Sequence, residues 1–529
     1  MNAKLPALIA ALLEPGRYAA VQPGPVERVE LIETHGAWVL LAGGFAYKIK
    51  KPVRFPFLDF SSLALRRQAC ETELRVNRRF QHPDRPATQL YLGVLPIVGT
   101  PDDPRWGTAS TPGAPPPIEY AVQMRRFDEA SRLDHLCQRD ELSPEHIAGL
   151  AERMAVFQAR AAVAAKDQPW GHPAAAMRWP RDNFNTLRSA LQAPADSAQV
   201  RGLSDWTEQR FHAIEPLLSR RRQKGRVREG HGDLHLANLV LVEGEVLPFD
   251  AIEFNDELRW IDVASDMAFT WMDLLHHGRP GLANVLMSAW LDASGDVSAP
   301  TVWSFFASYR AGVRAKVAAL RRGQLIGERP GSPPPPDAEA CLAEARHYLA
   351  LANEIAHPPT PQLLITHGLS GSGKTWASSQ WLAAERTGRA IRLRSDVERK
   401  RLHGLSALAS SGSGLNARLY SAQAHGATYA SLLDRSRVLL ADGWTVLVDA
   451  AFLRAAERAA FAALAQAAGV PFHILACEAP LAVLRQRISE RQARGNDASE
   501  ATAEVLEQQL GWLEPLTTDE RTRVVAAPS

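Results

Sequence analysis

Residues 231–238 read His-Gly-Asp-Leu-His-Leu-Ala-Asn, and residues 368–375 read Gly-Leu-Ser-Gly-Ser-Gly-Lys-Thr. In the first stretch Asp233 stands five residues before Asn238, the spacing at which a catalytic loop presents a general base and a magnesium ligand to one phosphate. The second stretch fits Gly-x-x-x-x-Gly-Lys-Ser/Thr, a loop whose backbone amides cradle phosphates. The two motifs belong to unrelated kinds of phosphoryl-transfer site, so the chain is expected to carry both.

Length and charge restrict the fold and the partners. At 529 residues the chain exceeds the roughly 250–300 residues beyond which a single core stops growing, so two or three domains are expected. Sixty basic against fifty-eight acidic side chains give a formal charge of +2, which removes a whole-chain electrostatic case for nucleic acid or an anionic membrane. The four cysteines lie far apart without metal-binding spacing, so a reducing cytoplasm is the expected location.

The N-terminal segment superficially resembles a secretion signal, because Lys4 precedes Leu-Pro-Ala-Leu-Ile-Ala-Ala-Leu-Leu. Glu14-Pro15-Gly16 then interrupts the apolar run, so a short amphipathic helix ending at Pro15 is expected instead. No stretch approaches 18 consecutive apolar residues, and no membrane span is predicted.

Proline-rich breaks and periodicity indicate the domain organisation. Residues 357–361, His-Pro-Pro-Thr-Pro, precede an apolar strand and are read as a linker between a domain over 1–356 and a domain over 362–529. Within the first domain, short strands are expected over 26–50, and the Pro- and Gly-rich segment 100–117 is expected to be an exposed, mobile loop.

A kinase site needs a cation on the triphosphate, two metal ligands and a carboxylate at the point of attack. Lys48 lies two residues after Ala46 on one strand face, so a small side chain leaves room for adenine while the lysine reaches the phosphates. Asp233 would be the general base and Asn238 one magnesium ligand. Asp250, twelve residues further on at a strand end, would be the second ligand.

Two choices around this lysine stay open. Lys50 shares the strand face of Lys48. A run of lysines on an edge strand is usually exposed to solvent and prevents the edge from pairing with another strand. Lys48 is preferred over Lys50 as the lysine that binds ATP. A partly buried helix over 63–80 could present Glu71 or Glu73 toward the lysine strand. Glu73 is chosen as the ion-pair partner.

The first half resembles the aminoglycoside phosphotransferase-like branch of the protein-kinase-like fold, over roughly residues 20–345. The resemblance is carried by His231-Gly-Asp233, Asn238, Asp250-Ala-Ile-Glu253 and Asp262-Val-Ala-Ser-Asp266. It implies a two-lobed, ATP-dependent kinase of small-molecule hydroxyls, with Asp233 as base and with Asn238 and Asp250 on magnesium. The chain has no Gly-x-Gly-x-x-Gly loop, and Ala251-Ile252 replaces the Phe-Gly of protein kinases, so small acceptors are expected rather than proteins.

The phosphate-cradling loop has the context that its chemistry requires. An apolar strand precedes it and a helix-compatible stretch follows, so backbone amides and the helix N-terminus can hold phosphates while Lys374 bridges them and Thr375 ligates magnesium. The nucleotide-binding residues are predicted to be Gly368, Ser370, Gly371, Ser372, Gly373, Lys374 and Thr375.

Two downstream segments add to this site. Val446-Leu-Val-Asp449 reads as a strand ending in an acid, where a magnesium-linked carboxylate sits in such folds. Residues 484–494 place Arg485, Arg487, Arg491 and Arg494 along a helix and its exit. They fit a closing lid and equally a solvated helix face with Glu490 as an intrahelical partner.

The second half resembles the small P-loop kinases of the nucleotide-kinase group, including gluconate-kinase-like, zeta-toxin-like and bacteriophage polynucleotide-kinase-like proteins, over about residues 361–529. The element Ser395-Asp396-x-x-Arg399 implies Asp396 as the base that activates an acceptor hydroxyl and Arg399 as a clamp on the substrate. The same resemblance implies Asp449 as the Walker-B-like acid and Arg487 and Arg491 as lid arginines.

The order of the two parts resembles a bacterial family of fused aminoglycoside phosphotransferase-like and P-loop kinase proteins, related to AAA domains. The expected fold is an α+β protein-kinase-like two-lobed domain, followed by an α/β P-loop NTPase domain with a parallel sheet. The expected function is ATP- and Mg²⁺-dependent phosphoryl transfer to small-molecule hydroxyls, with nucleic-acid ends less expected. The alternative is a regulatory protein in which a P-loop ATPase gates a non-catalytic kinase-like domain.

The acceptors themselves are not determined by these motifs. A basic stretch over 300–323 weakly favours an anionic acceptor, against the alternative of a solvated helix; its residues are Arg310, Arg314, Lys316, Arg321 and Arg322. The oligomeric state and any coupling between the two sites are not indicated by the sequence.

Overall fold

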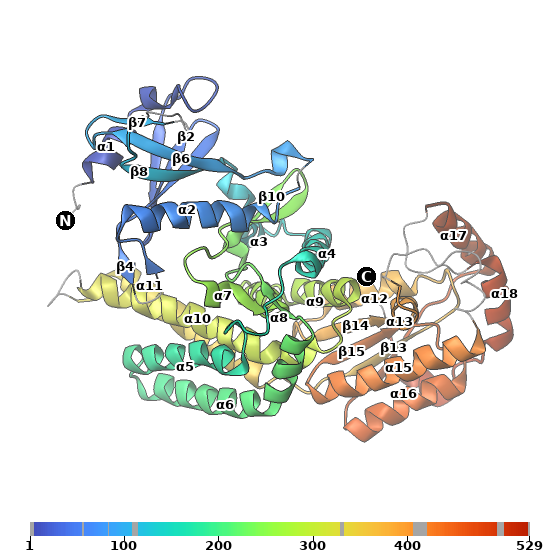
Figure 1. Cartoon of the computed structure of the whole chain (residues 1–529). Helices are drawn as coiled ribbons and strands as arrows, with labels where there is room; N and C mark the ends of the chain where they lie inside the picture. Colours follow the sequence, from blue (N-terminus) through green and yellow to red (C-terminus); the bar gives the residue numbers. More distant parts are fainter. Residues whose placement is uncertain are drawn as a thin grey trace. The chain divides into compact units, whose positions relative to one another are not determined.

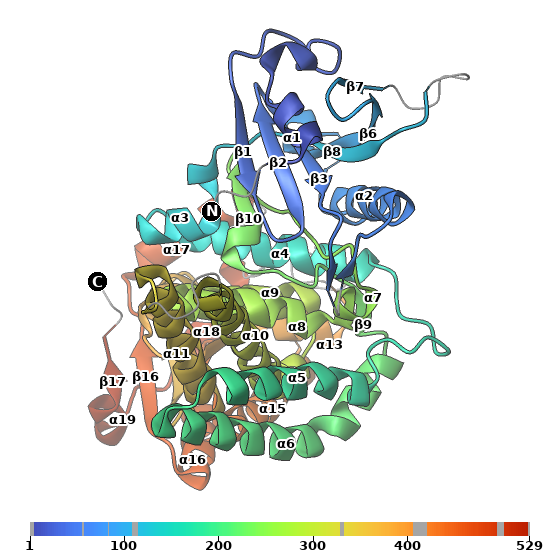
Figure 2. The same ribbon diagram turned by 90° about the vertical axis from the view of Figure 1, so that its left-hand side faces the viewer.

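The structure, a computed structural model, describes residues 5–55, 58–82, 84–107, 115–327, 333–405, 421–494 and 502–526. The chain forms two compact units. The first comprises Met1–Leu142, Arg160–Ala175 and Ser219–Asp266, and the second comprises Ser143–Ala159, Ala176–Leu218 and Met267–Ser529. Their elements are shown from two directions in Figures 1 and 2. Neither unit is one continuous segment of the chain.

The first unit contains a six-stranded sheet of order β1-β2-β3-β8-β6-β7. All of its neighbouring strands are antiparallel, and they are β1 (Val29–Glu33), β2 (Ala37–Ala42), β3 (Phe45–Lys50), β6 (Tyr91–Gly99), β7 (Pro104–Trp106) and β8 (Glu119–Arg125). Helix α2 (Leu63–Arg78) packs on β8 and β6 (Figure 1). Strand β3, which carries both candidate lysines, is therefore an interior strand with a helix beside the sheet.

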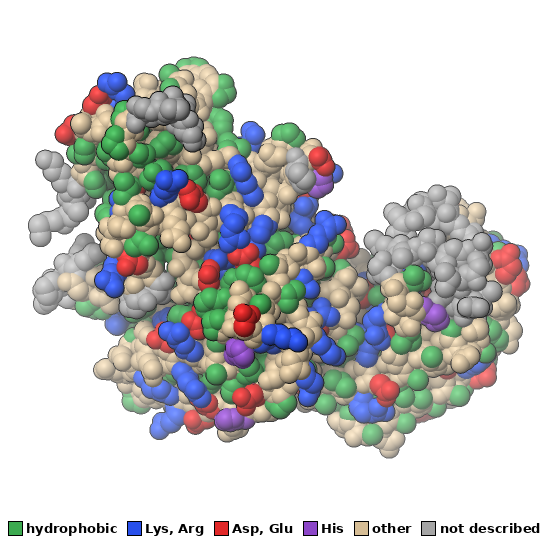
Figure 3. Space-filling model, in the orientation of Figure 1, with side chains coloured by type: hydrophobic (Ala, Val, Ile, Leu, Met, Phe, Trp, Pro, Cys, Tyr) green, Lys and Arg blue, Asp and Glu red, His purple; other side chains and the backbone are tan. Residues whose placement is uncertain are grey.

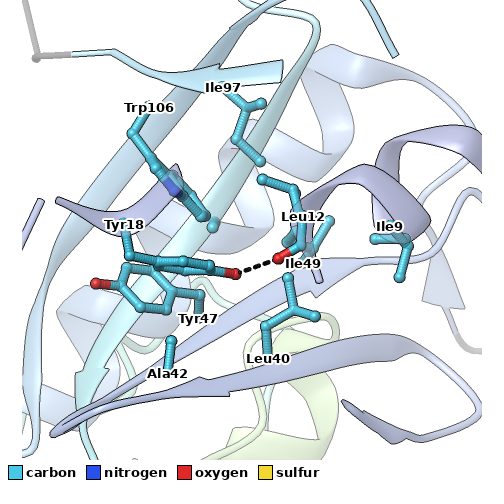
Figure 4. Close-up of a cluster of buried hydrophobic side chains, with 10 residues drawn as sticks. Ile9, Leu12, Tyr18, Leu40, Ala42, Tyr47, Ile49, Ile97 and Trp106 are labelled. Carbon is cyan, nitrogen blue, oxygen red and sulfur yellow. Dashed lines mark hydrogen bonds between the residues drawn. The ribbon is translucent and has the colours of Figure 1, made fainter. Parts of the chain in front are cut away.

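The N-terminal segment completes a buried apolar cluster on this sheet (Figure 4). Helix α1 (Ala7–Leu12) and the 3₁₀ turn η1 (Pro15–Tyr18) bring Tyr18 to the cluster, where its hydroxyl donates to the Leu12 carbonyl at 2.9 Å. The Tyr18 ring centroid lies 5.1 Å from that of Tyr47 and 5.6 Å from that of Trp106. The segment is thus part of the core of its unit.

The segment 100–117 differs from its sequence-based prediction as an exposed, mobile loop. Residues Pro104–Trp106 form β7, which pairs with β6, and Trp106 is 8% exposed. The large apolar surface of this tryptophan, buried against Tyr18 and Tyr47, accounts for the ordered strand. Residues 108–114 lie outside the described part of the chain.

The remaining elements of the first unit are short and surround the catalytic-loop motif. Two antiparallel pairs, β9–β12 and β10–β11, flank it. The elements are β4 (Arg54–Phe55), β5 (Leu58–Asp59), η2 (Pro86–Thr88), η3 (Glu129–Ser131), α3 (Leu133–Gln138), β9 (Val227–Glu229), η4 (Leu236–Asn238), β10 (Leu239–Val242), β11 (Glu245–Pro248), α7 (Asp256–Arg259) and β12 (Trp260–Asp262).

The second unit contains a layer of long helices that precede its parallel sheet along the chain. They are α4 (Pro144–Arg160), α5 (Pro173–Ala190), α6 (Pro194–Gln223), α8 (Val263–His276), α9 (Pro280–Ser294), α10 (Ala299–Gly327) and α11 (Pro336–Ala356), some of which extend into the first unit at one end. Helices α10 and α11 pack along each other (Figures 1 and 2). None of the described helices is long and apolar enough to cross a membrane.

A parallel five-stranded sheet of order β14-β15-β13-β16-β17 follows. Its strands are β13 (Leu363–His367), β14 (Ala390–Arg394), β15 (Thr445–Asp449), β16 (Phe472–Ala476) and β17 (Val524–Val525), and its helices are α12 (Lys374–Ala384), α13 (Ser395–Leu402), α15 (Ala422–Ala441), α16 (Ala455–Ala468), α17 (Leu481–Arg494), α18 (Ala503–Trp512) and α19 (Thr518–Thr522). Strands β13 and β15 are buried throughout, because helices cover both faces of a parallel sheet. The fold class predicted from the sequence is confirmed for both parts.

The helical layer and the parallel sheet share a buried interior within the second unit. The indole N–H of Trp271 on α8 donates to the Gly388 carbonyl at 3.1 Å, and its ring lies 5.9 Å from that of Trp444. The buried guanidinium of Arg389 donates to the Ser304 hydroxyl at 3.1 Å. The domain boundary at 357–361 stays a prediction, and segments on its two sides pack in one compact unit.

Gly281 on α9 allows the closest approach between these helices and the P-loop segment. A Cβ atom at this position would lie 1.8 Å from the Ala383 carbonyl oxygen. An alanine in place of an interior helix glycine usually stabilises by about 0.5–1 kcal/mol, whereas overpacking costs about 1–3 kcal/mol. Because the neighbouring atom is backbone, Gly281→Ala should lower the free energy of unfolding.

The matched control is Gly202→Ala in α6, where a Cβ atom would meet nothing within 4 Å. Urea unfolding should show Gly202→Ala equal to or more stable than the wild type and Gly281→Ala less stable. A stabilising effect of Gly281→Ala would contradict the close packing of α9 on the end of α12.

Candidate active sites

Two lysines of β3 converge on one buried glutamate of α2. The ammonium group of Lys48 lies 2.9 Å from Oε1 of Glu73 and 2.5 Å from Oδ1 of Asp250. The ammonium group of Lys50 lies 2.5 Å from Oε2 of Glu73 and also pairs with Glu253. The structure therefore brings together Lys48, Glu73 and Asp250, and it adds a second lysine and a third carboxylate.

The alternatives left open by the sequence differ sharply in their surroundings. Glu71 points to the exposed side of α2, where it pairs with Arg67 at 2.8 Å. Lys50 was read as a solvated guard on an edge strand, but it is 1% exposed, because β3 lies between β2 and β8. The interpretation of Lys50 as an exposed edge-strand lysine is therefore wrong. A local sequence pattern does not reveal the order of strands in a sheet.

The charge cluster keeps Lys48 and Asp250 ionised. Burial lowers the pKa of Lys48, but the charges of Asp250 and Glu73 more than offset this effect and hold the pKa well above its usual value. Burial likewise acts to raise the pKa of Asp250, and the charge of Lys48 holds it below its usual value. A fixed ammonium group is thus available to an anionic ligand at this position.

The catalytic-loop motif is held by a carboxylate behind it. Asp266 accepts the backbone N–H groups of His231 at 2.7 Å and Gly232 at 2.8 Å. Gly232 has φ +90°, and a Cβ atom there would lie 2.7 Å from the Leu258 carbonyl oxygen. A glycine is therefore required at this point of the loop.

His231 supports the loop as a neutral ring. Burial lowers its pKa, and its Nε2 lies 2.9 Å from the Phe249 carbonyl while its Nδ1 lies 3.2 Å from the Asp233 N–H. The neutral tautomer with a proton on Nε2 satisfies both contacts, because it donates to the carbonyl and accepts from the amide.

Asp233 and Asn238 face each other across the loop. The Asn238 amide donates to Oδ2 of Asp233 at 3.0 Å and to its backbone carbonyl at 2.9 Å. The charge of Asp233 also acts on the pKa of Asp250, so the two carboxylates lie near each other. Asp250 has φ +60°, and its N–H donates to the Tyr91 hydroxyl at 2.9 Å. The three predicted residues thus form one oxygen-rich group.

A network missed by the sequence analysis ties α2 to the strand before this loop. Glu229 accepts from Arg75 at 2.8 Å, from Arg79 at 2.9 Å and from Arg259 at 3.0 Å. Burial acts to raise the pKa of Glu229, but the three arginines lower it to about 2. The partners lie on α2, β9 and α7, and no local spacing in the sequence indicates their meeting.

The phosphate-cradling loop follows β13 in the second unit, and its glycines are sterically required. Gly368 has φ +148°, and a Cβ atom there would lie 2.2 Å from the Cys477 carbonyl oxygen. Gly371 has φ +81°, and a Cβ atom would lie 2.8 Å from the Leu484 carbonyl oxygen. The Lys374 ammonium donates to the Leu369 carbonyl at 2.8 Å. The loop therefore has the close backbone packing expected of a phosphate cradle.

A cavity of about 940 Å³ opens over this loop. Its lining brings together Asp396, Arg399, Asp449 and Arg487 with all the predicted loop residues except Gly368; those residues are Ser370, Gly371, Ser372, Gly373, Lys374 and Thr375. Its volume lies at the upper end of ligand pockets, which span about 300–1,000 Å³.

Arg487 is the one arginine of α17 for which a loop contact is described, since its guanidinium donates to the Gly371 carbonyl at 3.3 Å. Arg485 instead pairs with Glu507 at 2.8 Å. The Arg491 side chain lies outside the described residues. The Ser378 hydroxyl donates to Oδ2 of Asp449 at 3.2 Å.

The far side of the cavity is formed by α13 and its neighbours. Asp396 and Arg399 form an ion pair of 2.6 Å. His425, which the sequence analysis did not single out, lines the cavity and pairs with Glu457 at 2.7 Å. Trp512, to which the sequence assigned no role, also lines the cavity. These additional lining residues come from α15, α16 and α18, far apart in the sequence.

Comparison with known proteins identifies a domain in one part of the chain. The family model described as "AAA domain" matches residues 363–516. The chain therefore carries this domain in its C-terminal part. It is 30% identical over 489 residues to the uncharacterized proteins Rv2004c of Mycobacterium tuberculosis and Mb2027c of Mycobacterium bovis, covering 92% of this chain and 91% of each relative. The chain belongs to the family of these mycobacterial proteins.

Solved structures resemble its separate parts. The choline kinase from Cryptosporidium parvum is 11% identical, with 66% of this chain and 95% of that chain covered and a TM-score of 0.37. An aminoglycoside phosphotransferase from Alicyclobacillus acidocaldarius is 16% identical, covers 62% and 93%, and has a TM-score of 0.33. The Mycobacterium tuberculosis APS kinase CysC, solved with AMPPNP and APS, is 27% identical, covers 27% and 78%, and has a TM-score of 0.21.

Glu398 provides a pH-dependent test of how α13 is held. It is 1% exposed and pairs with Arg401 and Arg435 at 2.5 Å each. Burial acts to raise its pKa, but these partners lower it to about 2. A depressed folded-state pKa contributes stability above the ordinary pKa of the carboxylate, and that contribution is lost as the pH falls toward 2.

Glu398→Gln should therefore lower the free energy of unfolding by about 3 kcal/mol at pH 7. The difference from the wild type should shrink as the pH falls below about 5. Urea unfolding across this range measures it, and Asp434→Asn, which breaks an exposed pair with Arg437, should change nothing. A difference that is independent of pH would contradict the assigned ion pairs.

Proposed function

We propose that the chain is an ATP-dependent phosphotransferase with two phosphoryl-transfer sites that act on small-molecule hydroxyls. The observation that carries this proposal is the cavity of about 940 Å³, in which a phosphate-cradling loop, Asp449, Asp396 and Arg399 share one lining. A protein that only binds and hydrolyses a nucleotide needs the loop and Asp449. A general base, Asp396, and a substrate-binding arginine, Arg399, in the same lining are needed only for transfer to an acceptor.

In the P-loop site, the amides from Ser370 to Gly373 and the Lys374 ammonium would hold the ATP phosphates. Thr375 and Asp449 would hold Mg²⁺, which neutralises phosphate charge when bound. Arg487 would stabilise charge on the transferred phosphoryl group. Asp396 would accept the proton of the acceptor hydroxyl, and Arg399, which is already paired with Asp396, would hold the acceptor beside it.

In the kinase-like site, Lys48 would bind the ATP phosphates while Glu73 holds its ammonium group. Asn238 and Asp250 supply an amide and a carboxylate oxygen, the kind of ligand that Mg²⁺ prefers, and this ion usually completes its shell with substrate phosphates and water. Asp233, in contact with Asn238 through a 3.0 Å hydrogen bond, would take the acceptor proton.

The acceptor of the P-loop site is proposed to be anionic. Arg394, Arg399 and Arg454 all line the cavity, and arginine binds carboxylate and phosphate groups through paired hydrogen bonds. On the face of the molecule in Figure 3, by contrast, basic and acidic side chains are interspersed.

The basic stretch 300–323 gives this proposal less support than the sequence suggested. Arg310 is 3% exposed and lies over the Phe269 ring, Arg314 lies over the Tyr348 ring, and Lys316 pairs with Asp182 at 2.8 Å. These three side chains make contacts within the helical layer. We infer a cytoplasmic location because the four cysteines, all in the described part of the chain, are buried and form no disulfide, as is usual in a reducing compartment.

The test is transfer of label from ATP to a small-molecule extract, followed by identification of the products. Asp233→Asn should abolish one set of labelled products and Asp396→Asn another, because each variant keeps its nucleotide site but loses a proton acceptor. The double variant should lose both sets. Asp182→Asn, which breaks an exposed pair with Lys316, is the control and should keep all products.

Labelled products that persist in the double variant would contradict the assignment of both bases. Release of inorganic phosphate without any labelled metabolite would instead favour the regulatory alternative, in which a P-loop ATPase gates a kinase-like domain.

A further inference from the structure

Strand β14 is an edge strand of the parallel sheet, because it pairs with β15 on one side only. An edge strand leaves backbone N–H groups that need another acceptor when they are buried. Helix α9 supplies the acceptors: the Ala390 N–H donates to Oδ1 of Asn284 at 2.8 Å, and the Arg392 N–H donates to the Ser288 hydroxyl at 3.1 Å. Both acceptor residues are buried, at 0% and 1% exposed.

The spacing of these contacts follows from a helix that lies along a strand. Four helical residues, from Asn284 to Ser288, rise by about 6 Å. Two strand residues, from Ala390 to Arg392, advance by about 6.6 Å. Because the two advances nearly match, every fourth residue of α9 meets every second residue of β14. The next step of this register would place Asp292 opposite Arg394.

The charges of Asp292 and Arg394 act on each other, as this register requires. Asp292 is half-buried, and burial raises its pKa while Arg394 makes the largest opposing contribution among the neighbouring charges. The charge of Asp449 also reaches Asp292. Arg394 lines the cavity and is followed by Ser395 and Asp396, which also line it. Asn284, Ser288 and Asp292 thus form a polar stripe along α9, and the Asp292 end of this stripe lies beside the P-loop site.

The other end of the stripe holds the helix that follows the phosphate loop. The Asn284 amide donates to the Leu382 carbonyl at 3.1 Å and to Oε2 of Glu385 at 2.9 Å, at the end of α12. One helix thus contacts both the strand that leads to Asp396 and the helix that begins at Lys374.

We propose that α9 is the support that fixes β14 behind the P-loop site, and that Ser288 and Asp292 are positioning residues that hold β14 and, through Arg394, keep Asp396 at the cavity. This inference rests on the proposed function of that cavity as a phosphoryl-transfer site. This support is a helix that precedes the proline-rich break and lies about a hundred residues before its contacts on β14. The P-loop site therefore depends on residues that precede 357–361.

The first test is hydrogen exchange of the full-length chain, which needs no acceptor. Ser288→Ala and Asp292→Asn should increase deuterium uptake over residues 390–400 and leave the interior strand over 445–449 unchanged. Asp196→Asn is the matched control, because it removes the charge of a carboxylate paired with Arg346 at 2.9 Å between α6 and α11. The control should leave uptake over 390–400 unchanged, and thermal melting verifies that each variant is folded.

The second test separates positioning from structural support. With the kinase-like site silenced by Asp233→Asn, transfer of label from ATP to the small-molecule extract is measured at several ATP concentrations. Asp292→Asn should lower kcat by roughly ten- to a hundredfold, the size expected of a small misplacement, with KM for ATP unchanged.

The outcomes distinguish this inference from the function on which it rests. Unchanged uptake over 390–400 in both variants overturns the inference whatever the activity. A raised KM for ATP with kcat unchanged in Asp292→Asn also overturns it. If uptake changes as expected but the Asp233→Asn chain transfers no label that depends on Lys374, the proposed function fails while the role of α9 in holding β14 stands.

Discussion

A cation that is to bind a triphosphate must be held in place beforehand, and each proposed site of this chain holds its lysine with a carboxylate or a carbonyl. Glu73 contacts the ammonium groups of Lys48 and Lys50 at 2.9 and 2.5 Å, and the Leu369 carbonyl accepts from Lys374 at 2.8 Å. A cation fixed in this way needs little reorganisation when a phosphate binds, which is the main source of electrostatic stabilisation in such sites. The surrounding fold makes these contacts possible. Helix α2 lies beside the sheet and so places Glu73 at the two lysines, and the tight turn of the P-loop places the Leu369 carbonyl at Lys374.

The two halves of the sequence are not two independent bodies in the structure. Helix α9 seals the edge of β14, and Trp271 and Arg389 are buried between the helical layer and the parallel sheet. A proline-rich break between two motifs therefore indicates a change of fold but not a separation of cores. Covering the sheet edge with a helix also removes an exposed strand that could pair with another chain.

The sequence contained the parts of each site whose residues lie close along the chain. The spacing of Asp233 and Asn238 and the pattern of 368–375 correspond to local loops, so their neighbourhoods could be predicted; their chemical roles stay predictions. Contacts between distant elements could not be predicted, because nothing local indicates that Glu229 meets three arginines or that Glu457 meets His425. The misreading of Lys50 has the same origin, since only the strand order shows that β3 is interior.

The central claim is that one chain binds ATP at two chemically distinct places. Calorimetric titration of the intact protein with Mg²⁺ and a non-hydrolysable ATP analogue in place of ATP tests it most directly. The account predicts two bound nucleotides per chain, one lost in Asp250→Ala and the other in Lys374→Ala, with none bound when both changes are combined. A single bound nucleotide in the wild type, or the loss of both sites in either single variant with the fold intact, would contradict it.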